Sequence, residues 1–130
     1  MTRSRPKAEV RLAEQLVGSI AVTFVLGVVC FGGHWPGAGS FRPPLDKLAH
    51  FALYFSLGCG AWLATRGRYP FPVIVAGGAL GALDEWRQFY LPGRHPDGGD
   101  WVVDVVALAA AVIGFALLWH RWSPPRFGKE

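Results

Sequence analysis

The chain has 130 residues, of which 52% are hydrophobic and 17% charged, and its formal net charge is +4 at pH 7. This length suits one domain, and the composition is more apolar than that of a typical soluble domain. Soluble helical bundles normally carry charges along a solvent face, whereas here the charges gather at the ends of apolar stretches. Lys and Arg are spread among termini and short loops without a nucleic-acid motif, so we expect no nucleic-acid partner. The composition indicates an integral membrane protein.

The first apolar stretch is the longest. Residues 16–41 contain no Lys, Arg, Asp or Glu, and roughly 20 apolar residues are enough to cross about 30 Å of hydrocarbon. We therefore predict a first transmembrane helix over residues 12–31. The segment 32–44 that follows is rich in Gly and Pro, so it is predicted to be irregular, with Trp35 and Phe41 at headgroup depth.

Three further apolar stretches are each long enough to cross, and each has polar residues near one end. The predicted helices cover residues 47–65, 71–91 and 100–120. Pro70 and Pro72 favour a helix start at the third stretch. A dense cluster of turn residues separates the last two helices, and Asp100 is expected to be the N-cap of the fourth. The sequence therefore predicts one all-α domain, residues 1–130, built as a bundle of four transmembrane helices.

The distribution of basic residues predicts the topology, because Lys and Arg concentrate in cytoplasmic loops. Nine of the thirteen fall in the N-terminal tail, the loop between the second and third helices, and the C-terminal tail. The other four are Arg42, Lys47, Arg87 and Arg94. Both termini are therefore expected to be cytoplasmic, in a multi-pass protein of the inner (cytoplasmic) membrane with the other two loops outside.

This topology places acids, amides and one histidine at a single depth near the outer interface. The residues are Asp46 and His50 on the second helix, Asp84, Glu85 and Gln88 on the third, and Asp100 and Asp104 on the fourth. Within each helix they are three or four residues apart and so share a face. Arg94 in the adjoining loop, with Arg42 or Lys47, is placed to neutralise part of the acid charge.

Each of these residues also has a purely structural interpretation. Asp46 and Asp100 are suited to capping helices, and His50 and Gln88 to packing. Asp84, Glu85 and Asp104 are harder to explain in this way, because a carboxylate within an apolar helix costs about 2.5 to 3.5 kcal/mol on insertion scales. Acids on facing helices predict a shared polar cavity.

Such a cavity is compatible with three kinds of chemistry. It can hold a divalent cation through oxygen ligands, perform general acid–base catalysis, or relay protons. The sequence leaves these open and assigns no catalytic residue. Zinc is disfavoured because no pair of His or Cys has ligand spacing. Ser56 and Cys59 lie too deep in the second helix to be evident nucleophiles.

Three segments together resemble the VanZ-like family of small bacterial membrane proteins. They are Asp46–Phe51 with Tyr54, Asp84–Phe89 continuing through Pro92–Arg94, and Asp100–Asp104. The resemblance covers about residues 46–114. It implies a multi-span membrane protein of the cell envelope, linked through the founding member to tolerance of the glycopeptide antibiotic teicoplanin.

Two functions follow as hypotheses. In the first, the outer polar cavity binds a phosphorylated lipid or a lipid-linked envelope precursor, with Arg94 at the phosphate and the acids holding a cation or moving protons. In the second, the protein is a non-enzymatic assembly or protection factor whose polar cluster locks the helices together. A third hypothesis is a proton-coupled transporter subunit, which needs more than four helices and therefore requires the protein to oligomerise. Small residues at Gly58, Gly77, Gly78 and Gly81 allow close helix contacts, within one chain or between chains.

Overall fold

The computed structural model describes residues 5–34 and 44–122. All regular structure in these residues is helical, as predicted. The elements are α1 (Arg5–Phe31), the short 3-10 helix η1 (Gly32–His34), α2 (Leu45–Thr65), α3 (Pro70–Gln88) and α4 (Gly98–Trp122). Trp35, Phe41 and Arg42, which the sequence placed in an outer loop, lie outside the described residues.

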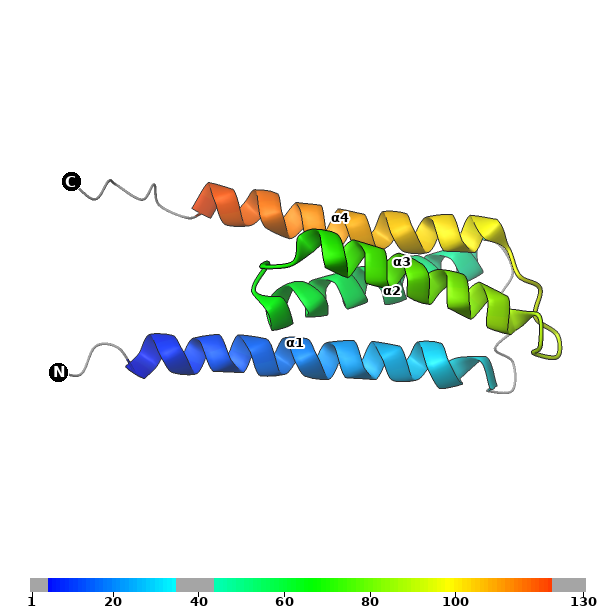
Figure 1. The fold of residues 1–130 in the computed structure, drawn as a ribbon, viewed down its shortest axis with the longest axis horizontal. Coiled ribbons are helices and arrows are strands. Elements are labelled where there is room, and N and C mark those ends of the chain that lie inside the picture. Colours follow the sequence, from blue (N-terminus) through cyan, green and yellow to red (C-terminus); the bar gives the residue numbers. More distant parts are fainter. Residues whose placement is uncertain (1–4, 35–43, 123–130) are drawn as a thin grey trace.

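The four helices lie side by side, and each runs antiparallel to its neighbour in sequence (Figure 1). Helix α2 packs against both α1 and α4, and α3 packs mainly on α4. The start of α1 and the end of α4 are at one end of the bundle. The end of α3 and the starts of α2 and α4 are at the other, so polar residues near those helix ends come to one end of the molecule.

Small residues bring the helices close together within the chain. A Cβ on Gly18 of α1 would lie 2.4 Å from the backbone nitrogen of Ala64 in α2. A Cβ on Gly77 of α3 would lie 2.3 Å from Cδ2 of Leu108, a fully buried α4 side chain. Gly58 faces α4 in the same way. Within the chain, Gly18 thus lies at the contact of α1 with α2, and Gly58 and Gly77 lie at contacts on both sides of α4.

The observed end of α3 and start of α4 differ from the predicted ones. Helix α3 begins at Pro70, one residue before the predicted start, and ends at Gln88 rather than at residue 91. The amides of residues 89–91 donate to carbonyls three residues earlier, so the last turn tightens out of the α-helix. Helix α4 begins at Gly98, and Asp97 caps it by accepting the amide of Gly99 at 2.7 Å. The prediction that Asp100 is the cap was wrong, and its carboxylate is available for other contacts.

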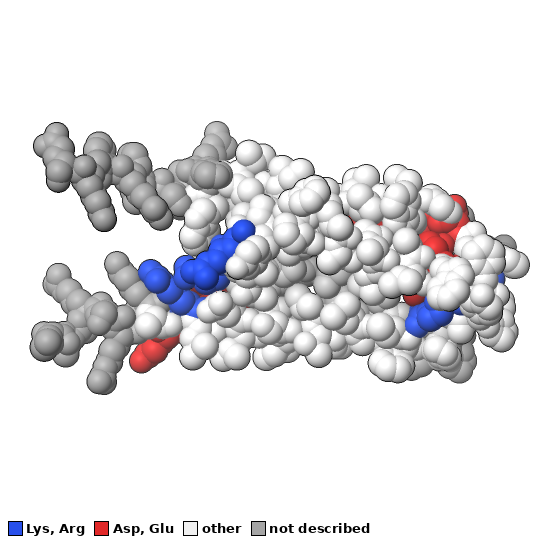
Figure 2. All heavy atoms as spheres, in the orientation of Figure 1, with Lys and Arg blue, Asp and Glu red and all other residues white. Residues whose placement is uncertain are grey.

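Three helical segments are long and apolar enough to cross a membrane: Ala8–His34, Leu45–Thr65 and Gly98–Trp119. The surface between the two ends of the bundle carries few charges (Figure 2). Large apolar side chains are exposed there, including Phe24 at 70% and Ile113 at 53%, and so extensive an apolar surface suits lipid better than water. These features indicate a multi-pass membrane protein. Helix α3 is not apolar enough over a comparable length, because its last turns contain the charged residues Asp84, Glu85 and Arg87.

Candidate functional site

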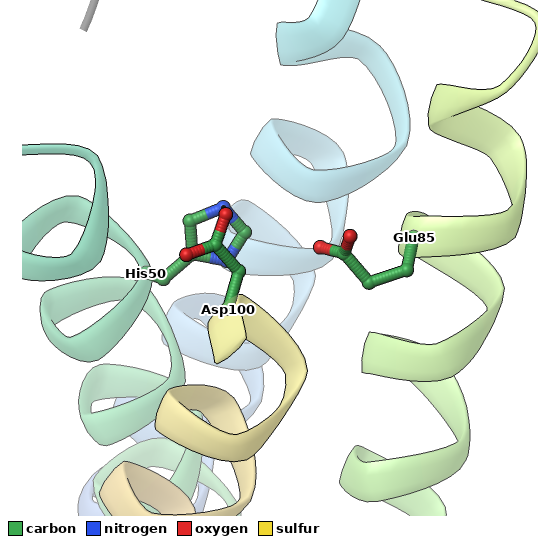
Figure 3. Close-up of side chains that lie close together, drawn as sticks. All are labelled: His50, Glu85 and Asp100. Atoms are coloured by element: carbon green, nitrogen blue, oxygen red, sulfur yellow. The ribbon is translucent and has the colours of Figure 1, made fainter. Parts of the chain in front are cut away.

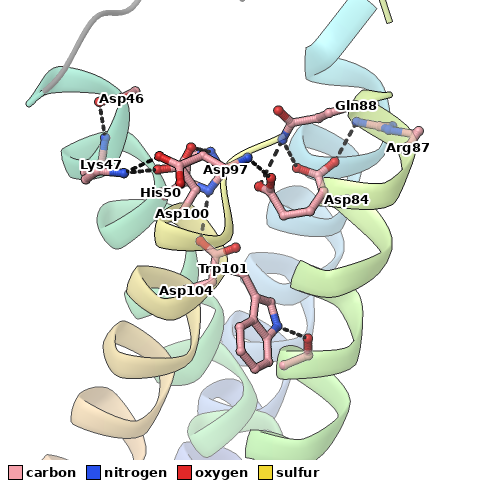
Figure 4. A network of polar contacts seen from close by, with 12 residues as sticks. Asp46, Lys47, His50, Asp84, Arg87, Gln88, Asp97, Asp100, Trp101 and Asp104 are labelled. Atoms are coloured by element: carbon pink, nitrogen blue, oxygen red, sulfur yellow. Dashed lines mark hydrogen bonds and ion pairs between the residues drawn. The ribbon is translucent and has the colours of Figure 1, made fainter. Parts of the chain in front are cut away.

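A network of polar side chains joins three helices at one end of the bundle (Figure 4). It draws on the first turns of α2, the last turns of α3, and the first turns of α4 with the loop before it. Several members are buried although they carry charge or an amide: Glu85 is 8% exposed, Gln88 4%, Asp100 6% and Asp104 0%. Buried polar groups are costly unless they are paired, so their partners decide what the network can do.

The deepest contact is a hydrogen bond between α2 and α4. His50 Nδ1 lies 2.9 Å from Oδ1 of the fully buried Asp104. A neutral imidazole that donates from Nδ1 presents Nε2 as an acceptor or a metal ligand. Nε2 lies 4.0 Å from Oδ2 of Asp100, beyond hydrogen-bond distance. The second oxygen of Asp104 has no hydrogen-bond partner among the described residues.

Lys47 connects the start of α2 to the start of α4. Its Nζ lies 2.8 Å from Oδ2 of Asp97 and 2.7 Å from Oδ1 of Asp100. Asp97 belongs to the loop before α4, outside the helices. Its hydrogen bond to Lys47, and then the amide of Gly99, lower the pKa of the Asp97 carboxyl below its ordinary value. Asp97 is therefore held as an anion between a helix cap and an ion pair.

The end of α3 joins the network through Gln88 and Glu85. The Gln88 amide donates to Asp84 and to Glu85, at 3.2 Å in both cases. The other Glu85 oxygen accepts the backbone amide of Asp97 at 2.8 Å. The predicted contacts on one face of this helix are thus present, and Glu85 also fixes the loop that leads into α4.

Arg87 ties α3 to the end of α1. Its guanidinium pairs with Asp84 at 2.8 Å and donates to the carbonyl oxygens of Val29, at 2.6 Å, and Cys30. The last carbonyls of a helix lack intrahelical partners and carry partial negative charge. A cation at this position therefore stabilises the end of α1 while neutralising an acid of the network.

One group within the network has the composition of a metal site. His50, Glu85 and Asp100 each offer a ligand atom, and these atoms lie within 4.8 Å of one another. The three side chains come from three different helices and point towards one another (Figure 3). Gly81 of α3 makes room for Asp104, the partner of His50, since a Cβ there would lie 3.0 Å from Oδ2 of Asp104.

Most of the residues proposed from the sequence meet in this network. Six do so: His50, Asp84, Glu85, Gln88, Asp100 and Asp104. Asp46 does not, because its carboxylate accepts the amide of Lys47, the next residue, at 2.8 Å. Among described residues, the only hydrogen bond of Arg94 is from its backbone amide to Leu91, at 3.2 Å. The intrahelical spacings from Asp46 to His50 and from Asp100 to Asp104 produce no hydrogen bonds; these residues bond elsewhere.

Three members of the network were not proposed as site residues from the sequence. Lys47 was considered only as a charge near the acids, Arg87 only in the distribution of basic residues, and Asp97 was not singled out. Lys47 and Asp97 are 50 residues apart, so no local spacing could connect them. The available signal was weaker: an acid directly before two glycines at the start of an apolar helix is a typical N-cap position.

Comparisons with protein-family models, with curated proteins and with solved structures found no match for this chain.

Proposed function

We propose that all four helices cross the inner membrane of a bacterium, with both ends of the chain in the cytoplasm and the polar network facing outwards. The excess of Lys and Arg at the opposite end supports this orientation. There, Arg66 and Arg68 follow α2 directly, and basic side chains gather at that end in Figure 2.

Helix α3 fits this arrangement only if its acidic end shares a polar layer with its neighbours. Residues 71–83 carry no charge and rise only about 20 Å at 1.5 Å per residue, against a hydrocarbon core of about 30 Å. The hydrogen bonds from Glu85 and Gln88 supply the polar partners that the end of α3 needs. This is the physical argument for counting α3 as a fourth span.

The function that this site supports best is recognition of a lipid headgroup, as part of a VanZ-like membrane protein. The class of ligand is a phosphorylated lipid or a lipid-linked envelope precursor. The observation that carries the proposal is a polar network at one end of a bundle whose sides are apolar: its acids Glu85, Asp100 and Asp104 are buried, and its basic residues Lys47 and Arg87 are partly exposed. A lipid is the one abundant molecule that reaches such a site from the side. Arg94, in the loop before Asp97, offers the planar donors that suit phosphate.

Lipid binding to the purified full chain tests this function. Thermal stability in detergent is measured with phosphatidic acid, undecaprenyl phosphate, and uncharged lipid as reference. We expect a phosphate-specific rise in wild type that is reduced in Glu85→Gln and Arg94→Ala. Glu9→Gln is the matched control, because Glu9 is an exposed acid at the opposite end of the bundle. Equal shifts in all variants, or none in wild type, would contradict the proposal.

A second function is supported by a specific observation. Lys47, Gln88 and Glu85 have their polar groups satisfied by partners inside the network, which is what a structural lock between helices requires. In this alternative the protein is a non-enzymatic assembly or protection factor. Glu85→Gln would then lower stability without changing lipid binding, whereas a folded, abundant variant that no longer binds lipid would exclude it.

The resemblance to the VanZ-like family adds glycopeptide tolerance to the proposal. Expression in a susceptible bacterium, with growth measured against teicoplanin, tests this part separately. Increased tolerance with wild type but not with Glu85→Gln would connect it to the polar network.

A further inference from the structure

We propose that His50, Glu85 and Asp100 form a binding site for a divalent cation of the Mn²⁺ type. This inference deepens the proposed headgroup function and rests on the same network. The three residues are contributed by α2, α3 and α4, so the site exists only where these helices meet (Figure 3).

The distances suit ligands of one ion. The nearest ligand atoms of His50 and Asp100, Nε2 and Oδ2, are 4.0 Å apart, too far for a hydrogen bond. Ligands about 2.1 Å from an octahedral ion lie about 3.0 Å apart when adjacent and about 4.2 Å when opposite. All three ligand atoms lie within 4.8 Å of one another, slightly beyond the largest octahedral separation, so small side-chain adjustments would bring them to one centre.

Asp104 supplies an independent reason to regard His50 as a ligand. Its carboxylate is 0% exposed and accepts from Nδ1 of the imidazole. Metal-bound histidines almost always donate their other ring N–H in this way, because the acceptor fixes the ring and makes the ligand nitrogen more basic. The second oxygen of Asp104 has no partner among the described residues, so this buried charge is compensated only through His50.

The charge balance of the network also calls for a cation. Among described residues it contains Asp84, Glu85, Asp97, Asp100 and Asp104, against Lys47 and Arg87. Arg87 pairs with Asp84, and Lys47 with Asp97 and Asp100. Neither Glu85 nor Asp104 has a Lys or Arg partner, and unpaired carboxylates are costly within apolar spans. A divalent ion between His50, Glu85 and Asp100 would reduce this excess from three negative charges to one, at the place where two of the acids are buried.

The ligand types select the ion. One imidazole with two carboxylates is a poor match for the Cys- and His-rich sets of structural zinc, and suits octahedral ions with mixed nitrogen and oxygen ligands. Three protein ligands leave positions for water or for phosphate oxygens. The cation therefore connects an acidic cluster to an anionic headgroup, which the acids alone would repel.

The test uses the full chain purified in detergent and freed of metal with a chelator, with Mn²⁺ alone as the probe. Free Mn²⁺ gives a paramagnetic resonance signal that weakens on binding. We expect one bound ion per chain. Binding should weaken at least about tenfold in His50→Ala and Glu85→Gln, and about tenfold in Asp104→Asn, which disturbs only the orientation of His50. Asp100→Asn keeps the shape of its side chain and replaces His50→Ala if that variant does not fold by circular dichroism.

Asp46→Asn is the matched control, because it removes a partly exposed carboxylate at the same end of the bundle that bonds to the amide of Lys47 and lies outside the network. Its affinity should stay within about twofold of wild type, since exposed charges are screened by salt. Absence of Mn²⁺ binding at millimolar concentration, or an equal loss in Asp46→Asn and Glu85→Gln, would overturn the site. The second result would mean diffuse attraction by the acids.

Lipid binding measured with chelator and with Mn²⁺ separates this inference from the proposed function. Phosphate-specific lipid binding that needs Mn²⁺ supports both. Equal lipid binding in chelator, without Mn²⁺ binding, overturns the metal site and leaves the headgroup function standing. Mn²⁺ binding without any lipid effect supports the metal site and contradicts the headgroup function.

Discussion

The hydrogen bond between His50 and Asp104 should couple α2 to α4 energetically, and a double-mutant cycle measures this coupling. The perturbations are His50→Ala, Asp104→Ala and the double substitution. Asp104 is fully buried and its Oδ1 lies 2.9 Å from the imidazole. Each single substitution leaves the other partner without its bond, whereas the double substitution removes both.

The expected magnitude follows from the burial of the pair. Hydrogen bonds between membrane helices average about 0.6 kcal/mol in double-mutant cycles and reach about 1.7 kcal/mol. A carboxylate with no exposure belongs in the upper part of this range, so we expect a coupling of about 1 to 1.7 kcal/mol. Each single substitution should lower the free energy of unfolding by about 1 to 3 kcal/mol, because it leaves a buried polar group unpaired.

Unfolding in mixed micelles with increasing dodecyl sulfate, followed by circular dichroism, provides the free energies. A second cycle between Asp46 and His50 is the control. These residues are four apart on α2, but Asp46 bonds to the amide of Lys47 instead, so their effects should add to within about 0.3 kcal/mol. If the coupling between His50 and Asp104 is no larger than in this control, the bond is absent from the folded protein in solution and the proposed orientation of the histidine is refuted.

Three further predictions concern other contacts of the bundle. Gly18→Ala should lower the free energy of unfolding by about 1 to 3 kcal/mol, because its Cβ would lie 2.4 Å from the α2 backbone. Gly27→Ala, whose Cβ would have nothing within 4 Å, should be neutral or slightly stabilising in the same assay. Arg87→Gln should cost about 1 to 3 kcal/mol by releasing two α1 carbonyls and one acid, and an unchanged unfolding curve would exclude this link. The pKa of Asp97 is lowered by its lysine partner and by the Gly99 amide, so its contribution is present above about pH 4 and lost as the pH falls further. Thermal stability measured against pH should therefore fall less steeply in acid for Asp97→Asn than for wild type, and identical profiles would contradict the ion pair.

The helices could be predicted because apolar length is a local property of the sequence. The run around α1, the prolines at the start of α3 and the glycine-rich loop before α4 each carry their signal within a few residues. Helix α3 was predicted three residues too long because the apolar Phe89 and Leu91 continue the pattern. Its last turn tightens through hydrogen bonds to carbonyls three residues back, which hydrophobicity does not encode.

Six residues of the polar network were predictable from the sequence, whereas Lys47, Arg87 and Asp97 and most of the connections were not. Spacing correctly paired Gln88 with Asp84 and Glu85 on one helix. The bond from His50 to Asp104 joins residues 54 apart, and it depends on how α2 and α4 pack. The Asp97 side chain caps α4 by accepting the amide of Gly99. Because the cap is at Asp97, the carboxylate of Asp100 is available to Lys47.

The uncharged lengths of three helices bear on how deep the network would lie if all four helices span the membrane, as proposed. Residues 51–65, 71–83 and 105–119 are uncharged and separate the network from the opposite end of the bundle. At 1.5 Å per residue they rise about 20 to 23 Å, which is several ångströms short of a hydrocarbon core of about 30 Å. Either the bilayer thins around the protein or the acids lie within its outer part. If the acids lie within the hydrocarbon, the proposed headgroup ligand would reach the network by moving sideways and inwards, as an amphipathic lipid can; if the bilayer thins, the partly exposed Lys47 and Asp97 would meet the interface directly. Because three helices share this short apolar length, the depth of the network is a property of the whole bundle.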